Sequence, residues 1–227
     1  MKNLSTKRSL RPLSTFGPMF RRMKRGLNLT GFAIRQRSPF KREVCKINLC
    51  SGNRRIPGYF NVDIGSGADL TIDLAKRDLP FPPNSVESLV CMSAINYFTR
   101  SRASELIRQC HDILSPGGIA RFGVQDLETL ARRYVRKDRE FFFQKGPDGK
   151  DRFEGPTIGD KFAAWFYGYV AGGYPCRYFY DYESLAFLFR ETGFSVVERR
   201  GYRDSRLEQI ESIDNRPEQM FFLEAIK

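Results

Sequence analysis

The residues best suited to ligand chemistry lie in one short stretch, where an apolar run enters a turn and a second apolar run ends on Asp63. The first run leads into the turn 49–53, where Gly52 lets the backbone approach a ligand without an intervening Cβ atom. The Asp63 carboxylate offers two acceptor oxygens, which suit the paired hydroxyls of a ribose. This spacing predicts a nucleotide-like ligand held by two strand ends.

Elements that could position these residues follow from residue 44 onward, where apolar runs alternate with longer segments of helical period. This alternation is typical of an α/β domain with a mostly parallel sheet. A proline followed by two glycines at 116–118 predicts the end of one of the helices. We expect seven strands, at 45–50, 59–64, 68–72, 87–93, 118–124, 195–202 and 219–226, and helices at 101–114, 126–143 and 181–192.

The pattern breaks between about 144 and 178, where glycines and prolines punctuate a stretch rich in Phe and Tyr. Around Trp165 the apolar residues favour a short amphipathic helix. Because ligands in open α/β sheets bind above the carboxyl ends of the strands, one interpretation is a lid or substrate wall. The other is a satellite hydrophobic cluster, and the sequence leaves both open.

Composition narrows the class of protein. With 227 residues, of which 41% are hydrophobic, we expect one globular domain. Five cysteines without a CxxC pair, together with a single histidine, give no recognisable zinc motif, so we expect reduced thiols and no metal. Since the chain has neither a long apolar run nor the apolar core of a secretory signal, we expect a cytoplasmic protein.

The positive charge is concentrated in an N-terminal segment, 1–43, which we expect to lie outside the domain 44–227. Residues 1–47 hold 13 Lys and Arg against a single acidic residue, Glu43. Within it, Met19, Met23 and Leu27 recur at helical spacing. A peripheral membrane anchor on an anionic surface, a helix packed on the domain and a transit peptide all fit this pattern. Nucleic-acid binding is less favoured, because no aromatic and basic platform accompanies the segment.

Several ordered motifs resemble the class I S-adenosylmethionine-dependent methyltransferases, in particular the methyltransferase type 11-like group often associated with glycan or cell-envelope synthesis. The resemblance covers roughly 44–227. The family segments that read like LNLGCG and PGWxNVD are matched at 47–52 and 57–63, and LPFPDNS is matched at 79–85. An LxPGG turn at 114–118 and a PDL-like segment at 125–127 follow in the same order. The resemblance implies a Rossmann-like methyltransferase fold, with helices on both faces of the mostly parallel seven-stranded sheet.

The resemblance also implies S-adenosyl-L-methionine as the cofactor. Its methionine end is expected against the turn, its ribose hydroxyls on Asp63 and its adenine near Asp73 and Leu74. Asp69 and Asp78 lie close enough in sequence to exchange roles with Asp73. The cofactor-binding residues that the resemblance implies are Leu49, Cys50, Ser51, Gly52, Asp63, Asp73, Leu74 and Ser93.

Two departures from the family pattern bear on activity. Cys50 stands where the family usually has glycine, and 93–98 lacks the family's histidine. We expect His111, beside Asp112, to be a surface residue. Methyl transfer relies largely on positioning, so a carboxylate or phenol can suffice as base. The candidates are Asp126, Tyr97 and Tyr180, for which helix capping or aromatic packing is the alternative.

The expected function is therefore methyl transfer to a small-molecule or saccharide-type acceptor, at the membrane surface if the basic segment docks there. Two alternatives stay open. One is a catalytically degenerate methyltransferase fold that acts as a binding protein, which Cys50 and the missing histidine would favour. The other is an RNA methyltransferase whose basic segment contacts phosphates.

Overall fold

The computed structural model describes residues 44–146 and 148–227. The basic segment 1–43 and its expected helix lie outside the described residues, and that part of the domain prediction stays untested. Each helix in the described ranges falls short of the length and apolarity needed to cross a bilayer.

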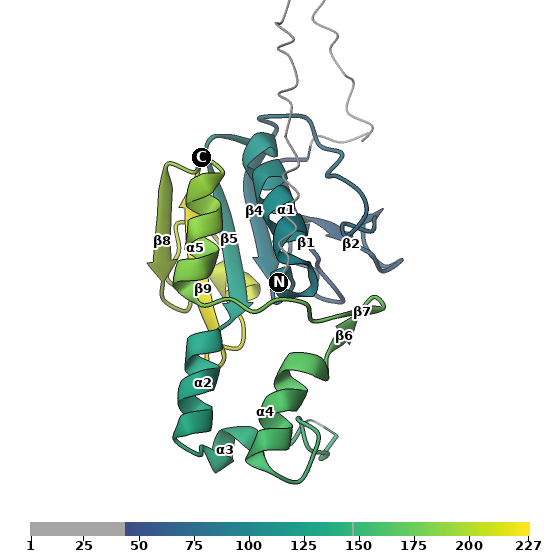
Figure 1. The fold of residues 1–227 in the computed structure, drawn as a ribbon. Coiled ribbons are helices and arrows are strands. Elements are labelled where there is room, and N and C mark those ends of the chain that lie inside the picture. The colour runs from purple at the N-terminus through teal and green to yellow at the C-terminus, as the bar shows by residue number, and fades with distance from the viewer. Residues whose placement is uncertain (1–43, 147) are drawn as a thin grey trace, which may run out of the picture. The chain divides into compact units, whose positions relative to one another are not determined.

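A seven-stranded sheet forms the centre of the described part (Figure 1). Its strand order is β3-β2-β1-β4-β5-β9-β8, and only β9 runs antiparallel to its neighbours. The expected mostly parallel seven-stranded sheet is confirmed, and the strand ends move by only a few residues. The strands are β1 Lys46–Leu49, β2 Phe60–Asp63, β3 Leu70–Thr71, β4 Val86–Met92, β5 Leu114–Gln125, β8 Val196–Arg200 and β9 Met220–Ile226.

One face of the sheet is covered by α1 (Arg100–Ile113) and α5 (Tyr182–Glu191), which lie side by side in Figure 1. Both helices bury an apolar face in the main core, as their helical period predicts. On this face Phe122 of β5 packs edge to face against Phe189 of α5, with ring centroids 5.0 Å apart. Thr99 caps the start of α1 through its side chain.

The opposite face is covered more thinly than expected. The connection 50–59 between β1 and β2 contains no helix, and a small cluster that includes Val90 and Ile213 fills this face. Ile213 belongs to the one-turn helix α6 (Ile210–Ile213). Helices were expected on both faces of the sheet. Among the described residues, α6 is the helix that covers this second face.

The prediction of one helix at 126–143 is wrong, because the chain forms two helices there. Helix α2 (Leu127–Val135) ends before Lys137, whose φ of 55° is left-handed, and α3 (Arg139–Phe142) follows. The Asp138 side chain accepts a hydrogen bond from the Phe141 backbone N–H and so caps α3. It also pairs with Arg133 at 2.5 Å, which fixes the break.

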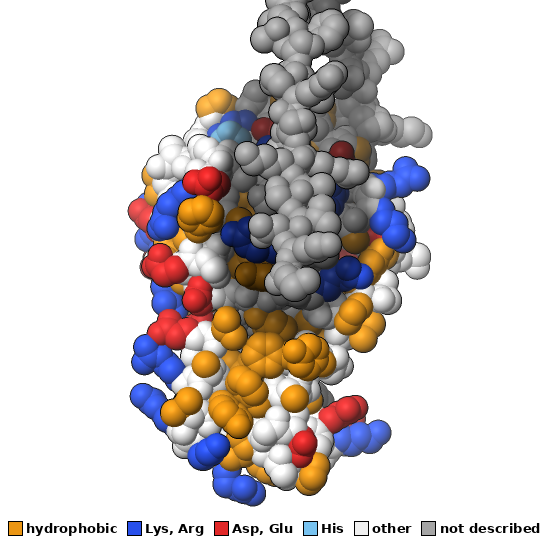
Figure 2. All heavy atoms as spheres, in the orientation of Figure 1, with side chains coloured by type: hydrophobic (Ala, Val, Ile, Leu, Met, Phe, Trp, Pro, Cys, Tyr) orange, Lys and Arg blue, Asp and Glu red, His pale blue; other side chains and the backbone are white. Residues whose placement is uncertain are grey.

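Beyond the carboxyl ends of the strands, α2, α3 and α4 (Ile158–Tyr167) form a separate lobe (Figure 1). Its own aromatic cluster centres on Phe142, Phe153 and Trp165. Figure 2 shows many hydrophobic side chains on this part of the surface, with Lys and Arg at its margins. A two-stranded hairpin, β6 (Val170–Ala171) and β7 (Tyr174–Pro175), leads back toward the sheet. The segment 144–178 thus contains the helix expected around Trp165 and also an unexpected hairpin.

Candidate functional site

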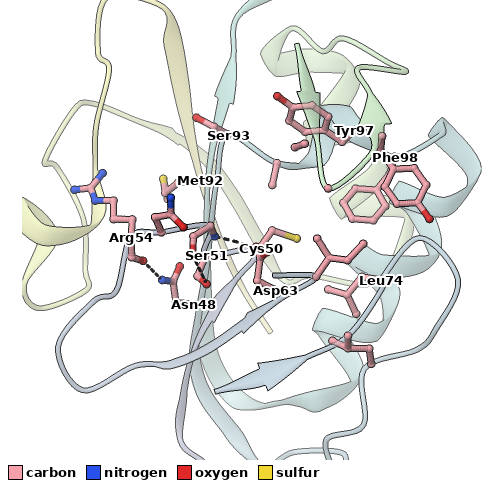
Figure 3. Close-up of a pocket in the computed structure, with 18 of the residues that line it drawn as sticks. Asn48, Cys50, Ser51, Arg54, Asp63, Leu74, Met92, Ser93, Tyr97 and Phe98 are labelled. Carbon is pink, nitrogen blue, oxygen red and sulfur yellow. Dashed lines mark hydrogen bonds between the residues drawn. The ribbon is translucent and has the colours of Figure 1, made fainter. Parts of the chain in front are cut away.

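A cavity of about 640 Å³ opens at the carboxyl ends of β1, β2 and β4 (Figure 3). Figure 3 shows Asp63 and Leu74 on one side of it and Ser93 and Tyr97 on the other. We call it the main pocket. Its volume lies within the range of roughly 300–1,000 Å³ that is typical of small-molecule and cofactor pockets. The lining residues are Asn48, Cys50, Ser51, Gly52, Asn53, Arg54, Ile56, Asp63, Ile64, Ile72, Asp73, Leu74, Ala75, Met92, Ser93, Ala94, Tyr97, Phe98, Ala171, Gly172, Tyr174, Ile213, Asn215 and Arg216.

The turn after β1 is tied to the end of β2. The Gly52 backbone N–H donates to Asp63 Oδ2 at 2.9 Å, and the Gly65 N–H donates to Asp63 Oδ1 at 2.8 Å. Gly52 has a φ of 53°, and a Cβ added there would meet nothing within 4 Å. The carboxylate is therefore oriented by two backbone donors and keeps lone pairs for a ligand at the open backbone of the turn.

Cys50 also adopts a left-handed backbone, with a φ of 53°. Non-glycine residues rarely adopt this conformation, so the side chain at Cys50 carries a conformational cost. Its thiol packs against the main core. A hydrogen bond with Cys50, together with burial, raises the pKa of Cys91 well above its ordinary value, so Cys91 is a neutral thiol.

Asp73 lies at the other end of the main pocket. Its Oδ2 accepts a hydrogen bond from the Tyr174 hydroxyl at 2.7 Å and lies 3.1 Å from Lys76 Nζ. Desolvation opposes ionisation, but the hydrogen bonds from Tyr174 and Lys76 outweigh it and lower the Asp73 pKa. Asp69, which holds Asn61 and Arg55, and Asp78, which holds Arg102 and Gln109, do not line the pocket. Asp73 is the carboxylate of the three that reaches the site.

The hairpin β6–β7 forms a wall of the main pocket. At its tip, Gly172 has a φ of 56°, and a Cβ there would meet Ile64 Cγ2 at 2.5 Å. The tip therefore approaches the end of β2 so closely that glycine is required. This contact and the hydrogen bond from Tyr174 to Asp73 hold the hairpin at the pocket, which Ala171, Gly172 and Tyr174 line. A lid role for 144–178 stays a prediction, which this wall supports.

A second cavity of about 240 Å³, which we call the side chamber, adjoins the main pocket. The two share Ser93, Tyr97 and Arg216. Ser93 lies just after β4 with a φ of 59°, and strained non-glycine residues of this kind are found at ligand sites. The side chamber is lined by Ser93, Asn96, Tyr97, Gln125, Arg152, Trp165, Tyr169, Cys176, Phe179, Arg216 and Gln219.

Most of the residues expected to bind the cofactor come together. Cys50, Ser51, Gly52, Asp63, Asp73, Leu74 and Ser93 all line the main pocket. Leu49 does not, because it is the last residue of β1 and its side chain is fully buried in the core. Their roles in cofactor binding stay predictions.

The three expected catalytic residues separate. Tyr97 lines both cavities, and desolvation raises its pKa above the ordinary value. Asp126 lines neither cavity, because it caps α2 by accepting from the Glu128 N–H at 3.1 Å and from Thr129 Oγ1 at 2.8 Å. Tyr180 is fully buried in the main core and also lies outside both cavities. Asp126 and Tyr180 thus make the capping and packing contacts of the structural alternatives, and the catalytic role of the three residues stays a prediction.

His111, expected to be a surface residue, is partly exposed. Its side chain is 21% exposed, packs edge to face on Phe194 and has Asp112 at 3.7 Å. It lies on α1, away from the lining of both cavities.

Sequence reasoning missed several lining residues. Asn48 interrupts the apolar β1 and is 3% exposed, and its Nδ2 donates to Asn61 Oδ1 at 3.0 Å. A polar residue inside an apolar strand was a usable signal for it. Tyr174 and Arg216 come from connections whose local sequence indicates no partner, so only the folded chain reveals them.

Sequence comparisons with known proteins assign no family to this chain, so its class is judged from the fold. No family model and no curated protein matches the chain. A solved S-adenosylmethionine-dependent methyltransferase from Mesorhizobium loti is similar at 15% identity with a TM-score of 0.46, over 82% of this chain and 91% of that one. One from Archaeoglobus fulgidus is similar at 14% identity with a TM-score of 0.46, over 82% and 87% respectively.

A third solved structure is phosphoethanolamine N-methyltransferase 2 of Haemonchus contortus in complex with S-adenosyl-L-methionine. It is similar at 14% identity with a TM-score of 0.47, over 83% of this chain and 50% of that one. The strand order decides the fold class, because the antiparallel strand β9 lies between β5 and the edge strand β8. It is the Rossmann-like methyltransferase fold.

Proposed function

We propose that this protein is an S-adenosyl-L-methionine-dependent methyltransferase. The observation that carries the proposal is the main pocket itself. There a left-handed glycine turn and the Asp63 carboxylate meet at adjacent strand ends around about 640 Å³ of open space. A cavity filled by side chains around Gly52 and Asp63 would favour the catalytically degenerate alternative. The open pocket therefore argues against it.

The lining residues fit this cofactor chemically. Asp63 has acceptor capacity for the ribose hydroxyls, and Leu74 and Ile72 give an apolar surface near Asp73 for a flat base. The open backbone at Gly52 suits the amino-acid end. Bound there, the cofactor would supply a methyl group made electrophilic by its sulfonium. The chain's own contribution is then to hold an acceptor in line and to exclude water.

Calorimetry of the full chain with S-adenosylhomocysteine tests the proposal. We expect binding, and we expect Asp63→Ala to weaken it by about tenfold or more, because a hydrogen bond to a charged group is lost. Asp63→Asn, which keeps one acceptor oxygen, should fall between the two. Asp112→Asn removes an exposed carboxylate outside the pocket and serves as the control.

Absence of binding by the intact chain would refute the proposal. Unchanged affinity in Asp63→Ala, with a native circular dichroism spectrum, would also refute the role of that carboxylate.

The acceptor in this proposal is a small molecule or saccharide, met at an anionic membrane surface through the basic segment 1–43. The 12 Lys and Arg of this segment support the location. Flotation with anionic liposomes, with and without residues 1–40, tests it, and equal recovery of both proteins would contradict membrane docking. Strongly salt-dependent RNA binding by the full chain would instead favour the RNA alternative.

A further inference from the structure

The side chamber carries positive charge without a carboxylate in its lining. Arg152 and Arg216 both line it. Arg152 Nη1 donates to Gln144 Oε1 at 2.7 Å and lies 3.7 Å from Glu218. Within the part of the chain that the structure describes, no acidic side chain lies within ion-pair distance of Arg216. The charge of the lining therefore favours an anionic occupant.

Two buried acceptor atoms in the same lining lack donors. Asn96 is 2% exposed, and its Oδ1 has no hydrogen-bond partner, although its Nδ2 lies 3.1 Å from Cys176 Sγ. The Oε1 of Gln125, at the end of β5, is likewise buried without a partner. Buried polar atoms are almost always hydrogen-bonded, so two orphans in one lining indicate a ligand that brings donors. Hydroxyl groups on an anionic molecule meet this need.

The side chamber also lacks a base. Its titratable residues other than the arginines are Tyr97, Tyr169 and Cys176. Desolvation raises the pKa values of Tyr97 and Cys176, so both keep their protons at neutral pH. A hydroxyl nucleophile would have no group there to take its proton, and an ammonium would be repelled by the arginines. A carboxylate needs no deprotonation at neutral pH.

We propose, resting on the methyl transfer proposed above, that the side chamber binds a small hydroxylated carboxylic acid whose carboxylate oxygen is the methyl acceptor. An oxygen lone pair forms the new O–CH₃ bond, and the S–CH₃ bond breaks with its electron pair remaining on sulfur. The carboxylate and the sulfonium become a neutral ester and a neutral thioether, and no proton moves. A volume of about 240 Å³ suits an acid of monosaccharide size.

Ligand-observed NMR in the presence of saturating S-adenosylhomocysteine tests the acceptor class. The probes are matched pairs of hydroxylated molecules with and without a carboxylate, glucuronate with glucose and glycerate with glycerol. We expect each acid to bind and its neutral partner to bind at least about tenfold more weakly. Neutral partners that bind as well as the acids, or absence of binding by both acids, would overturn the proposal.

Variants locate the binding. Arg152→Gln should weaken binding of the acids by about tenfold, since it removes a guanidinium from the side chamber only. Gln125→Glu, nearly isosteric, should repel the acids and leave the neutral probes unchanged. Arg132→Gln, an exposed arginine on α2 outside both cavities, is the matched control. Acid binding that is unchanged in both lining variants would contradict the assignment.

Two readouts separate this inference from the function on which it rests. If S-adenosylhomocysteine does not bind the full chain, the proposed function fails. If it binds but the acids show no preference, only the acceptor class fails. Where an acid binds, incubation with S-adenosyl-L-methionine should give a product that releases methanol in alkali, as a methyl ester does. A base-stable methylated product would contradict ester formation.

Discussion

Cys50 places a side chain where the backbone favours glycine. Its φ of 53° matches that of Gly52 two residues later, so the turn contains two left-handed residues. A non-glycine residue in this region costs about 1–2 kcal/mol. The half-buried thiol packs against the main core, which offsets part of that cost.

The cost can be isolated with two variants that both remove the thiol. We expect Cys50→Gly to exceed Cys50→Ala in free energy of unfolding by about 1 kcal/mol, because only the alanine retains the left-handed strain. Urea denaturation followed by circular dichroism measures the difference. Equal stabilities, or a more stable alanine variant, would show that the turn relaxes around a side chain.

At the level of single residues, the sequence predicted the pocket lining best where a residue lies at the end of a predicted strand. Gly52 and Asp63 are anchored by adjacent strands, and both line the main pocket. Asp126 also follows a strand, but it is drawn into the first turn of α2 by two nearby donors. The spacing of residues does not distinguish a carboxylate that faces a ligand from one that caps a helix.

A long-range hydrogen bond from Tyr174 to Asp73 ties the hairpin β6–β7 to the main pocket, and the residues that follow it, 176–178, bond to Asn96. We expect Tyr174→Phe to speed amide exchange in 168–175 by about fivefold or more, because the hydroxyl is lost while the ring remains. Hydrogen exchange with mass spectrometry measures this. Tyr167→Phe, on an exposed residue at the end of α4, is the control, and exchange equal to that of the control would contradict the tether.

The same hydrogen bond predicts a pH dependence. Because the Asp73 pKa in the folded chain lies below its ordinary value of 3.8, the tether stabilises the fold at pH values above 3.8. Its contribution is lost as the pH falls through the lower folded pKa. Wild-type and Asp73→Asn stabilities should therefore converge only in that acidic range. A constant difference between them down to pH 2 would contradict the tether.

Elements were predictable where their pattern is local. The runs that form β4 and β9 are mostly apolar segments, as expected for buried strands. The break between α2 and α3 was not, because 126–143 keeps a helical period while Lys137 adopts a left-handed conformation. The contact of the hairpin with Asp73 joins residues 101 positions apart, a separation that no local signal spans.

Across the whole described domain, a buried charge network fastens the segment that carries Arg216. Arg121 of β5 is fully buried and bonds both carboxylate oxygens of Asp214, at 2.8 and 2.6 Å. It also lies 3.4 Å from Glu224 of β9. Asp214 follows α6 directly, so the network ties this side of both cavities to the sheet.

We expect Arg121→Met to lower the free energy of unfolding by about 3–5 kcal/mol, because it leaves the buried Asp214 carboxylate without its cation, whereas Glu224 keeps Arg206 at 2.9 Å. Chemical denaturation measures the loss. Arg190→Met, on an exposed residue of α5, should change stability by less than about 0.5 kcal/mol. Equal effects of the two variants would show that solvent reaches the network.

Ser93, Tyr97 and Arg216 belong to the walls of both cavities. A ligand that shifts any of these side chains in one cavity changes the affinity of the other, and thermodynamic reciprocity requires the two ligands to affect each other by the same factor. Where such a shift occurs, the two dissociation constants are linked through the shared wall and must be measured as a pair.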